Sequence, residues 1–340
     1  MRTVLVVGGY GAVGATVTRS LAEWSPGRVV CAGRDLGRAR ALADQVGATA
    51  AGLDVTDVKG FERLLAEHGV GVVVLCVKPS DGALARACLS NGVHLVDVGA
   101  SYHLLALTEE LTETALEAAA TAVLSVGLAP GLTNVLAGRA CRDLGGADRI
   151  DVTVLLGAGE QHGADALRWT LTQLVAPRQR AARGPARVFL PGYGHRTAHP
   201  FPFSDQYTLR RTLGVTDVTT RLCLDSRVLT TLLFALRRTG LLRLAARLDV
   251  LRALTAAAGK VHFGSDGFAV AAEAVHNGHR VAYALTGNAQ GHVTGLVAAH
   301  VAHTLLGRGL PPGVHHLDEL TAFAGLPERI GLRVLTRTTR

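Results

Sequence analysis

The sequence predicts an α/β fold, in which a Rossmann-type, doubly wound parallel sheet is joined to an α+β second domain with a mixed or antiparallel sheet. In residues 1–125, short apolar runs alternate with segments of helical periodicity. The first apolar run leads directly into a glycine-spaced turn. After about residue 145 the alternation ends, and Asn277-Gly278 separates two strand-like runs, which indicates antiparallel pairing.

The first part of the chain contains five apolar runs that predict strands. They are Thr3–Val7, Arg28–Ala32, Val70–Val77, His94–Val98 and Ala122–Val126. Predicted helices lie between or beside them, at Ala12–Trp24, Gly37–Val46, Val58–His68, Asp81–Asn91 and Leu104–Ala120. Continuous apolar strands separated by helices are typical of a parallel sheet covered on both faces.

The second part is less regular. Strands are predicted at Ile150–Leu156 and Thr219–Leu224, and a hairpin at Phe268–Leu285. Helices are predicted at Ala164–Leu174, within Val228–Ala258 and at His292–Leu306, and a loop rich in Arg, Pro and Gly at Pro177–Pro202.

Composition indicates a globular protein, since 48% of the 340 residues are hydrophobic and 18% are charged. The five cysteines lack metal-ligand spacing, so no metal site is expected. No secretory signal is visible before the first strand, and we expect a reduced, cytoplasmic protein. The uncharged run Ala118–Gly138 contains Pro130 and Gly131, which favours strand, turn and helix over a membrane span.

The net charge of +8 is concentrated in the middle of the chain. Residues 165–252 hold 15 arginines and 5 aspartates, whereas residues 1–125 hold 10 basic and 13 acidic residues. This segment either attracts an anionic substrate or cofactor phosphate, or forms a solvated arginine-rich surface. Nucleic acid is disfavoured as a partner because the segment lacks interleaved aromatic residues and nucleic-acid motifs.

The glycine-spaced turn is the first candidate site. Gly9-Tyr10-Gly11-Ala12-Val13-Gly14 has the G-x-G-x-x-G spacing between a strand and a helix, which places backbone N–H groups where a dinucleotide pyrophosphate binds. The next strand ends at Gly33-Arg34-Asp35. Arg34 can pair with a 2′-phosphate, so the sequence favours NADP(H), while Asp35 keeps NAD as the second choice.

Further candidates follow later strands. Asp54 and Val55 come after the third strand candidate and are expected beside the adenine. Cys76, Val77 and Lys78 come at the end of the fourth strand. Because ligands bind outside the carboxyl ends of parallel strands, we expect Lys78 near the nicotinamide or the substrate.

Three segments of the sequence resemble the saccharopine dehydrogenase-like NADP-binding oxidoreductases. The first is the glycine turn together with Ala32-Gly33-Arg34-Asp35-Leu36, and the second is Ala87–Asp97. The third and most specific is Gly127-Leu128-Ala129-Pro130-Gly131-Leu132-Thr133-Asn134, which resembles the family's turn between domains. Two positions depart from the family pattern, since Lys78 stands where glycine is more frequent and Ala129 replaces a frequent aspartate.

The resemblance implies a split first domain, residues 1–134 and 289–340, which binds the dinucleotide. Residues 135–288 would then form the substrate-binding and dimerisation domain, with a homodimer expected. It also implies hydride transfer at a carbon–nitrogen bond, either an imine or a secondary amine, of an amino-acid-like anionic substrate.

Candidates for handling the proton are Lys78, Tyr102, His103 and His162, since one side chain must give or take a proton beside the nicotinamide. The Pro130-Gly131 turn and Asn134 begin a helix that would attract a substrate carboxylate. Asp205 and Tyr207 are candidates for binding an amine or hydroxyl, and Arg168 for binding a carboxylate.

Three other functions remain open on the sequence. One is a redox-neutral transferase, similar to homospermidine synthase, whose bound nicotinamide takes and returns a hydride within one turnover. The second is an NADP-binding sensor or scaffold without catalysis, and the third is reduction of a simple ketone or aldehyde.

Overall fold

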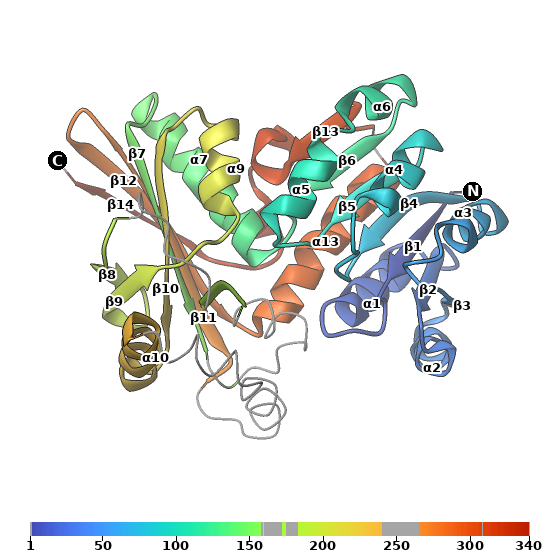
Figure 1. Cartoon of the computed structure of the whole chain (residues 1–340), viewed down its shortest axis with the longest axis horizontal. Helices are drawn as coiled ribbons and strands as arrows, with labels where there is room; N and C mark the ends of the chain where they lie inside the picture. The colour runs from blue at the N-terminus through green and yellow to red at the C-terminus, as the bar shows by residue number, and fades with distance from the viewer. Residues whose placement is uncertain are drawn as a thin grey trace. The chain divides into compact units, whose positions relative to one another are not determined.

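The computed structural model describes residues 2–157, 159, 172–174, 183–239, 265–307 and 309–339. The chain divides into two compact units (Figure 1). The first unit comprises Met1–Leu132 and Gly291–Leu326, and the second comprises Thr133–Gln290 and Pro327–Arg340.

The first unit is built on a parallel sheet, and the predicted Rossmann-type arrangement is confirmed. Among the described residues the sheet has seven strands in the order β13-β6-β5-β4-β1-β2-β3. Every pair in it is parallel. The order reverses between β1 and β4, so a ligand is expected at the carboxyl ends of these two strands. The strands are β1 (Thr3–Val7), β2 (Val29–Gly33), β3 (Thr49–Gly52), β4 (Val70–Leu75), β5 (His94–Asp97), β6 (Thr121–Leu124) and β13 (Gly313–His316).

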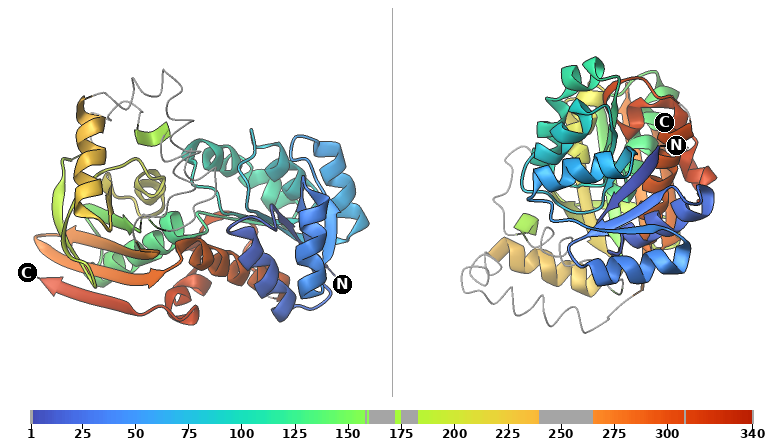
Figure 2. Two further views of the ribbon diagram at one scale, coloured as in Figure 1. Left: turned by 90° about the horizontal axis from the view of Figure 1, so that it is seen from below. Right: turned by 90° about the vertical axis from the view of Figure 1, so that its right-hand side faces the viewer.

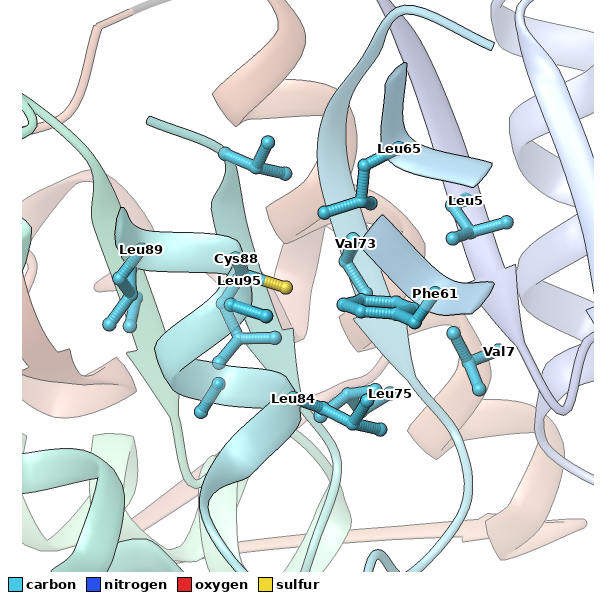
Figure 3. Packing of buried hydrophobic residues seen from close by; sticks show 14 of the residues in the cluster. Leu5, Val7, Phe61, Leu65, Val73, Leu75, Leu84, Cys88, Leu89 and Leu95 are labelled. Atoms are coloured by element: carbon cyan, nitrogen blue, oxygen red, sulfur yellow. The ribbon is translucent and has the colours of Figure 1, made fainter. Parts of the chain in front are cut away.

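Helices cover both faces of this sheet (Figure 1). On one face Phe61 and Leu65 of α3 and Leu84 and Cys88 of α4 pack with Val73 and its neighbours in one buried cluster (Figure 3). On the other face Cys31 packs with α2. The helices of this unit are α1 (Gly14–Trp24), α2 (Leu36–Val46), α3 (Val58–Glu67), α4 (Ala83–Ser90), α5 (Tyr102–Glu109), α6 (Thr112–Glu117) and α13 (Gln290–Gly307).

One predicted helix, Leu104–Ala120, is in fact two. The helices α5 and α6 are separated at Glu110 and Leu111. Leu111 is buried at 2% exposure, and the Thr112 hydroxyl donates to the Glu109 carbonyl. The chain therefore turns here to bury a leucine, which helical periodicity alone does not reveal.

The second unit contains a mixed sheet, as predicted. Its strands run in the order β14-β12-β11-β7-β10-β9-β8, and β14 lies along β12 at one edge (Figure 2). The pair β7–β10 is parallel, and the pairs β10–β9, β11–β7, β11–β12, β12–β14 and β8–β9 are antiparallel. The strands are β7 (Arg149–Leu156), β8 (Ala186–Leu190), β9 (Gly194–Pro200), β10 (Asp217–Leu224), β11 (Gly267–His276), β12 (His279–Asn288) and β14 (Val334–Thr339).

The predicted hairpin is confirmed as β11–β12, with Asn277 and Gly278 at its turn. Both residues have positive φ, 50° and 83°, as a tight hairpin turn of this kind requires. Helix α7 (Thr133–Leu144) packs against β11 and β12, and α9 (Asp205–Thr212) and α10 (Arg227–Thr239) pack against β10.

One expectation for the second unit was wrong, and one helix was missed. The segment Pro177–Pro202, expected to be a loop, contains the β8–β9 hairpin, whose turn uses Gly192 and Gly194 with positive φ. Arginines at exposed strand positions, such as Arg187, hide the apolar alternation of these strands. Helix α9 was not predicted, because its sequence is mostly polar although Leu209 is fully buried.

The end of the chain differs from the expected division at residues 289–340. Residues Pro327–Arg340 belong to the second unit, because β14 pairs with β12. An edge strand such as β12 exposes unpaired backbone groups, and β14 satisfies them.

Some predictions fall outside the described residues. These predictions are most of the helix Ala164–Leu174 and the part of Val228–Ala258 that follows α10. Within the described ranges, no helix is long and apolar enough to cross a membrane.

Candidate functional site at the carboxyl ends of the first sheet

The glycine turn joins β1 to α1 through close backbone contact. A β-carbon at position 14 would lie 2.1 Å from the Gly8 carbonyl oxygen, so any larger residue would push α1 away from the strand. No side chain caps the start of α1 at Val13. The Ala15 and Thr16 N–H groups donate to the Gly11 and Val13 carbonyls, and a glycine-spaced helix start of this kind is the arrangement that binds a dinucleotide pyrophosphate.

Tyr10 lies across the end of β2. A β-carbon at Gly33 would come within 2.5 Å of the Tyr10 ring, and the Tyr10 hydroxyl accepts a hydrogen bond from the Asp35 N–H at 2.9 Å. The Arg38 guanidinium carbon lies 4.7 Å from the centre of the Tyr10 ring. An aromatic face with a stacked cation is thereby held beside the glycine turn.

The Asp35 carboxylate is already used by the protein. Its Oδ1 accepts a hydrogen bond from the Arg38 N–H at 3.0 Å and caps α2. An NAD-binding site needs a carboxylate at this strand end to accept from the ribose 2′-hydroxyl. With Asp35 committed to the helix and both Arg34 and Arg38 exposed, the residues fit a 2′-phosphate instead.

Asp54 adds a negative charge close to these arginines. The Thr56 N–H and hydroxyl both donate to Asp54 Oδ1, and these bonds, with a smaller contribution from Arg34, lower the pKa of Asp54. The carboxylate therefore stays ionised at neutral pH. Val55, the next predicted residue, packs with its apolar side chain against the buried cluster.

Cys76, Val77 and Lys78 follow β4, as expected. The Cys76 N–H donates to the Val7 carbonyl, and the Val77 side chain lies where a β-carbon on Gly8 would fall. Lys78 is exposed. These residues and the glycine turn therefore lie together at the reversal of strand order.

Asp97, at the end of β5, is a buried carboxyl group that the sequence reasoning did not single out as a candidate. Its side chain accepts a hydrogen bond from the Gly99 N–H at 2.7 Å. Burial raises the pKa of Asp97 to about 6, and burial together with the charge of Asp97 raises the pKa of Cys76 to about 12. A carboxyl group that titrates near neutral pH at this edge is suited to proton transfer.

Tyr102 and His103, predicted to handle a proton, begin α5 just beyond β5. Both are exposed, Tyr102 at 37%. Their strand-end position agrees with the expectation, and their role stays a proposal. His162 and Arg168 lie outside the described residues.

A buried serine, histidine and glutamate form a network at the ends of β6 and β13. Ser125 Oγ is 2.8 Å from His316 Nδ1, and His316 Nε2 is 2.8 Å from Glu109 Oε1. Ser125 and His316 are fully buried. Their distance in sequence, almost 200 residues, explains why the sequence reasoning missed the network.

The Pro130-Gly131 turn is adjacent to Ser125 of this network. Gly131 has φ 136°, and a β-carbon there would be 3.0 Å from the Ser125 carbonyl oxygen. The Ala129–Pro130 peptide is cis. The Leu128 N–H donates to the Thr294 hydroxyl at 3.2 Å. Position 131 therefore requires glycine, both for its positive φ and for its close contact with the Ser125 carbonyl oxygen.

In the second unit, two predicted substrate residues share one buried network. The Thr133 hydroxyl donates to Asp205 Oδ2 at 2.9 Å, and the Asn134 amide donates to the Thr208 hydroxyl at 3.0 Å. Asp205 Oδ1 is buried without a hydrogen-bond partner, and burial raises the pKa of Asp205 to about 6. Tyr207 lies in the same first turn of α9. This network offers a carboxylate that an ammonium or hydroxyl group would satisfy.

No group of His, Cys, Asp and Glu side chains suited to a metal ion occurs in the part of the chain that the structure describes. All five cysteines are free thiols.

Comparison with known proteins gives a family match over the first part of the chain and a structural likeness over its full length. Residues 4–146 match the protein-family model described as the saccharopine dehydrogenase NADP binding domain. The solved structure of saccharopine dehydrogenase (L-Glu forming) from Saccharomyces cerevisiae is similar over 100% of both chains, with a TM-score of 0.71 and 16% identity. No match was found among curated proteins.

A second solved structure shows how far partial likenesses extend. Serine dehydrogenase from Escherichia coli is 17% identical, with a TM-score of 0.27, over 38% of this chain and 85% of its own. The similarity to the yeast enzyme over the whole chain shows the fold, and the match of residues 4–146 confirms the resemblance in sequence and NADP(H) as the cofactor.

Replacing Asp205 by asparagine should change how stability depends on pH. Since the pKa of Asp205 is about 6 when folded and about 3.9 when unfolded, the folded state holds the extra proton between these values. The protonated Asp205 carboxyl group makes its full contribution to folding stability below about pH 4, and this contribution is lost as pH rises through 6. Asp205→Asn should therefore gain about 2–3 kcal/mol over the parent protein between pH 4 and 6.5.

The measurement is urea unfolding at a series of pH values. Asp44→Asn, which changes an exposed carboxylate on α2, serves as the control and should show no such gain. A constant difference between Asp205→Asn and the parent protein at every pH would contradict the prediction.

Ser125 should tolerate glycine better than alanine. Ser125 has φ 55°, a left-handed conformation that costs a non-glycine residue about 1–2 kcal/mol. Both substitutions leave His316 Nδ1 without its partner, which costs about 1–3 kcal/mol, but only glycine removes the backbone strain. Thermal or urea unfolding should place Ser125→Gly about 1 kcal/mol above Ser125→Ala.

Ala119→Gly is the matched control, because exposed Ala119 has φ 49°. It should stabilise the protein through relief of strain alone. Equal stability of Ser125→Ala and the parent protein would show that the buried network contributes nothing.

Proposed function

We propose that this chain, whose N-terminal domain belongs to the saccharopine dehydrogenase-like NADP-binding family, transfers a hydride between NADP(H) and a carbon–nitrogen bond. The substrate class is an imine or secondary amine of an amino-acid-like anion. The observation that carries the proposal is the likeness to the yeast L-Glu-forming saccharopine dehydrogenase, which extends over both units rather than the cofactor domain alone.

The first unit supports the cofactor end of the reaction. NADPH, when bound, supplies a hydride from its nicotinamide ring. The backbone from Gly9 to Gly14 would hold the pyrophosphate at the start of α1. Arg34 and Arg38 would hold the 2′-phosphate, with Tyr10 beside them.

Proton transfer is assigned to the carboxyl edge of the same sheet. Lys78, Tyr102 and His103 are there, and Asp97 joins them as a buried group with a pKa of about 6. His162 remains a candidate from the sequence. We favour Asp97 as the group that stores the proton, because burial rather than an ion pair sets its pKa.

Substrate recognition is assigned to polar groups at the start of α7 and α9. The Pro130-Gly131 turn and Asn134 would bind the carboxylate, with Arg168 as a further candidate. Asp205, with its unpartnered oxygen, and Tyr207 would bind the amine. Ala129 stands where the resemblance implies an aspartate, so we propose a related secondary amine rather than saccharopine itself.

The reaction itself is tested by supplying NADPH with paired 2-oxo acids and amino acids. We expect loss of NADPH absorbance with stoichiometric formation of a reduced secondary amine, detected by mass spectrometry. Product without net NADPH loss would indicate the redox-neutral transferase instead. Tight NADPH binding with no product over a broad panel would favour the sensor or scaffold.

The cofactor assignment predicts selective losses in two variants. Arg34→Ala and Arg38→Ala each remove one charged partner of the 2′-phosphate, which is worth about 1.5–3 kcal/mol, or roughly 10- to 100-fold. The Kd for NADPH, measured by fluorescence titration, should rise by that factor while the Kd for NADH changes by less than about threefold.

Arg40→Ala, an exposed arginine of α2, is the control and should leave both constants unchanged. Equal weakening of NADPH and NADH by Arg34→Ala would contradict a phosphate contact.

A further inference from the structure

The second unit carries a cavity of about 690 Å³ on one face of its mixed sheet. Its walls come from β7, β8, β10, β11, β12 and β14 and from the segment before β8, all within this unit. Six arginines line it, namely Arg149, Arg183, Arg187, Arg221, Arg280 and Arg337.

The strand register explains the floor of this cavity. Thr153 pairs with Ala271, Ala271 with Ala284, and Ala284 with Leu335 across four strands. These side chains share one face of the sheet, since paired residues point to the same side. Two neighbouring alanines at the centre of the row leave room above the sheet, so the cavity follows from small residues in register.

The charge in the cavity is not balanced. The Asp151 carboxylate lies within 3.0 Å of nitrogens on Arg149 and Arg183 and 2.5 Å from Arg221 Nη1. Arg221 is 4% exposed, so this cluster is a built part of the sheet. Asp151 thus contacts three guanidinium groups, of which Arg183 also lies 3.2 Å from Asp217 outside the cavity lining. Glu273, 3.4 Å from Arg280, is the other carboxylate among the lining residues.

Two arginines are left for a ligand. Arg187 on β8 and Arg337 on β14 are both exposed, and neither has a carboxylate within ion-pair distance in the described ranges. A second cavity of about 360 Å³ shares Arg187 and His195 with the first and adds Arg196 and Arg227 without any carboxylate. The positive potential therefore continues along the β8–β9 hairpin.

We propose that the cavity lined by these six arginines, here called the arginine groove, binds a small polyanion, of the phosphate or polycarboxylate type, apart from the cofactor site. Planar guanidinium groups hold such oxyanions with paired hydrogen bonds, and the volume is typical of a metabolite site. The alanine floor and Phe189, exposed at 49%, contact the apolar part of the ligand. The inference uses only residues of the second unit and does not depend on the proposed oxidoreductase reaction.

Calorimetric titration with pyrophosphate and with citrate, at about 0.15 M salt, tests the proposal. Salt at this level screens exposed charges beyond about 8 Å, so simple attraction by net charge is weakened. We expect one site per chain with a Kd below about 1 mM for at least one probe. The probe with the lower Kd, pyrophosphate or citrate, indicates whether the ligand is a phosphate or a polycarboxylate.

The double variant Arg187→Gln and Arg337→Gln should weaken binding at least tenfold. Both residues are outside the Asp151 cluster, so the fold should persist, and an unchanged Kd for NADPH reports that it does. Arg238→Gln, an exposed arginine of α10 that does not line the groove, removes one equal charge and should bind as the parent protein does.

Three results would overturn the proposal: no binding of either probe, equal weakening by Arg238→Gln, or tighter binding of a single-stranded oligonucleotide than of either probe. The first would mean that the arginines form a solvated surface, the second that net charge alone attracts the probe, and the third that the groove reads nucleic acid. NADPH consumption in the reaction assay is unaffected by any of them, so the two proposals fail separately.

Discussion

Close backbone contact at glycines is the constraint on which the first unit depends. Gly14 brings the start of α1 against the Gly8 carbonyl, and no larger side chain fits between them. Gly295 makes a similar contact between α13 and α1, since a β-carbon there would lie 2.6 Å from the Thr16 β-carbon. Residues from the two ends of this unit are thereby joined around the glycine turn.

Carboxylate groups differ in burial and therefore in pKa. Asp35 is exposed, and one of its carboxylate oxygens caps α2. Asp97 and Asp205 are buried, one in each unit, and burial raises the pKa of each to about 6. Keeping an unpaired carboxyl group away from water costs stability, which is a known feature of sites that bind or transfer protons.

Arginines are arranged differently in the two units. The first unit presents Arg34 and Arg38 as exposed cations beside Tyr10, where a single phosphate would be bound. The second unit gathers arginines on one sheet face around Asp151. Three arginines of the positively charged middle segment, Arg183, Arg187 and Arg221, line this groove together with Arg149, Arg280 and Arg337 from outside the segment.

Local patterns were enough for much of the fold. The apolar runs before Gly9 and at Val70–Leu75, the glycine spacing and the Asn277-Gly278 turn each act through neighbouring residues, and the structure contains all of them. The β8–β9 hairpin was missed because Arg196 stands opposite Val188 on the apolar face and interrupts the alternation. Helix α9 was missed because its polar residues are buried by tertiary contacts that no local pattern contains.

The sequence by itself determined the parallel sheet, the turn after β1 and the preference for a phosphorylated dinucleotide, because these follow from residues adjacent in the chain. Tertiary structure alone decided that Asp35 caps α2 while Arg38 stacks on Tyr10, and that Ser125, His316 and Glu109 meet. It also decided that Asp97 titrates near neutral pH and that six arginines face one groove. The reason is physical: burial, pKa and charge clustering depend on contacts between residues far apart in the chain, which periodicity and spacing do not encode.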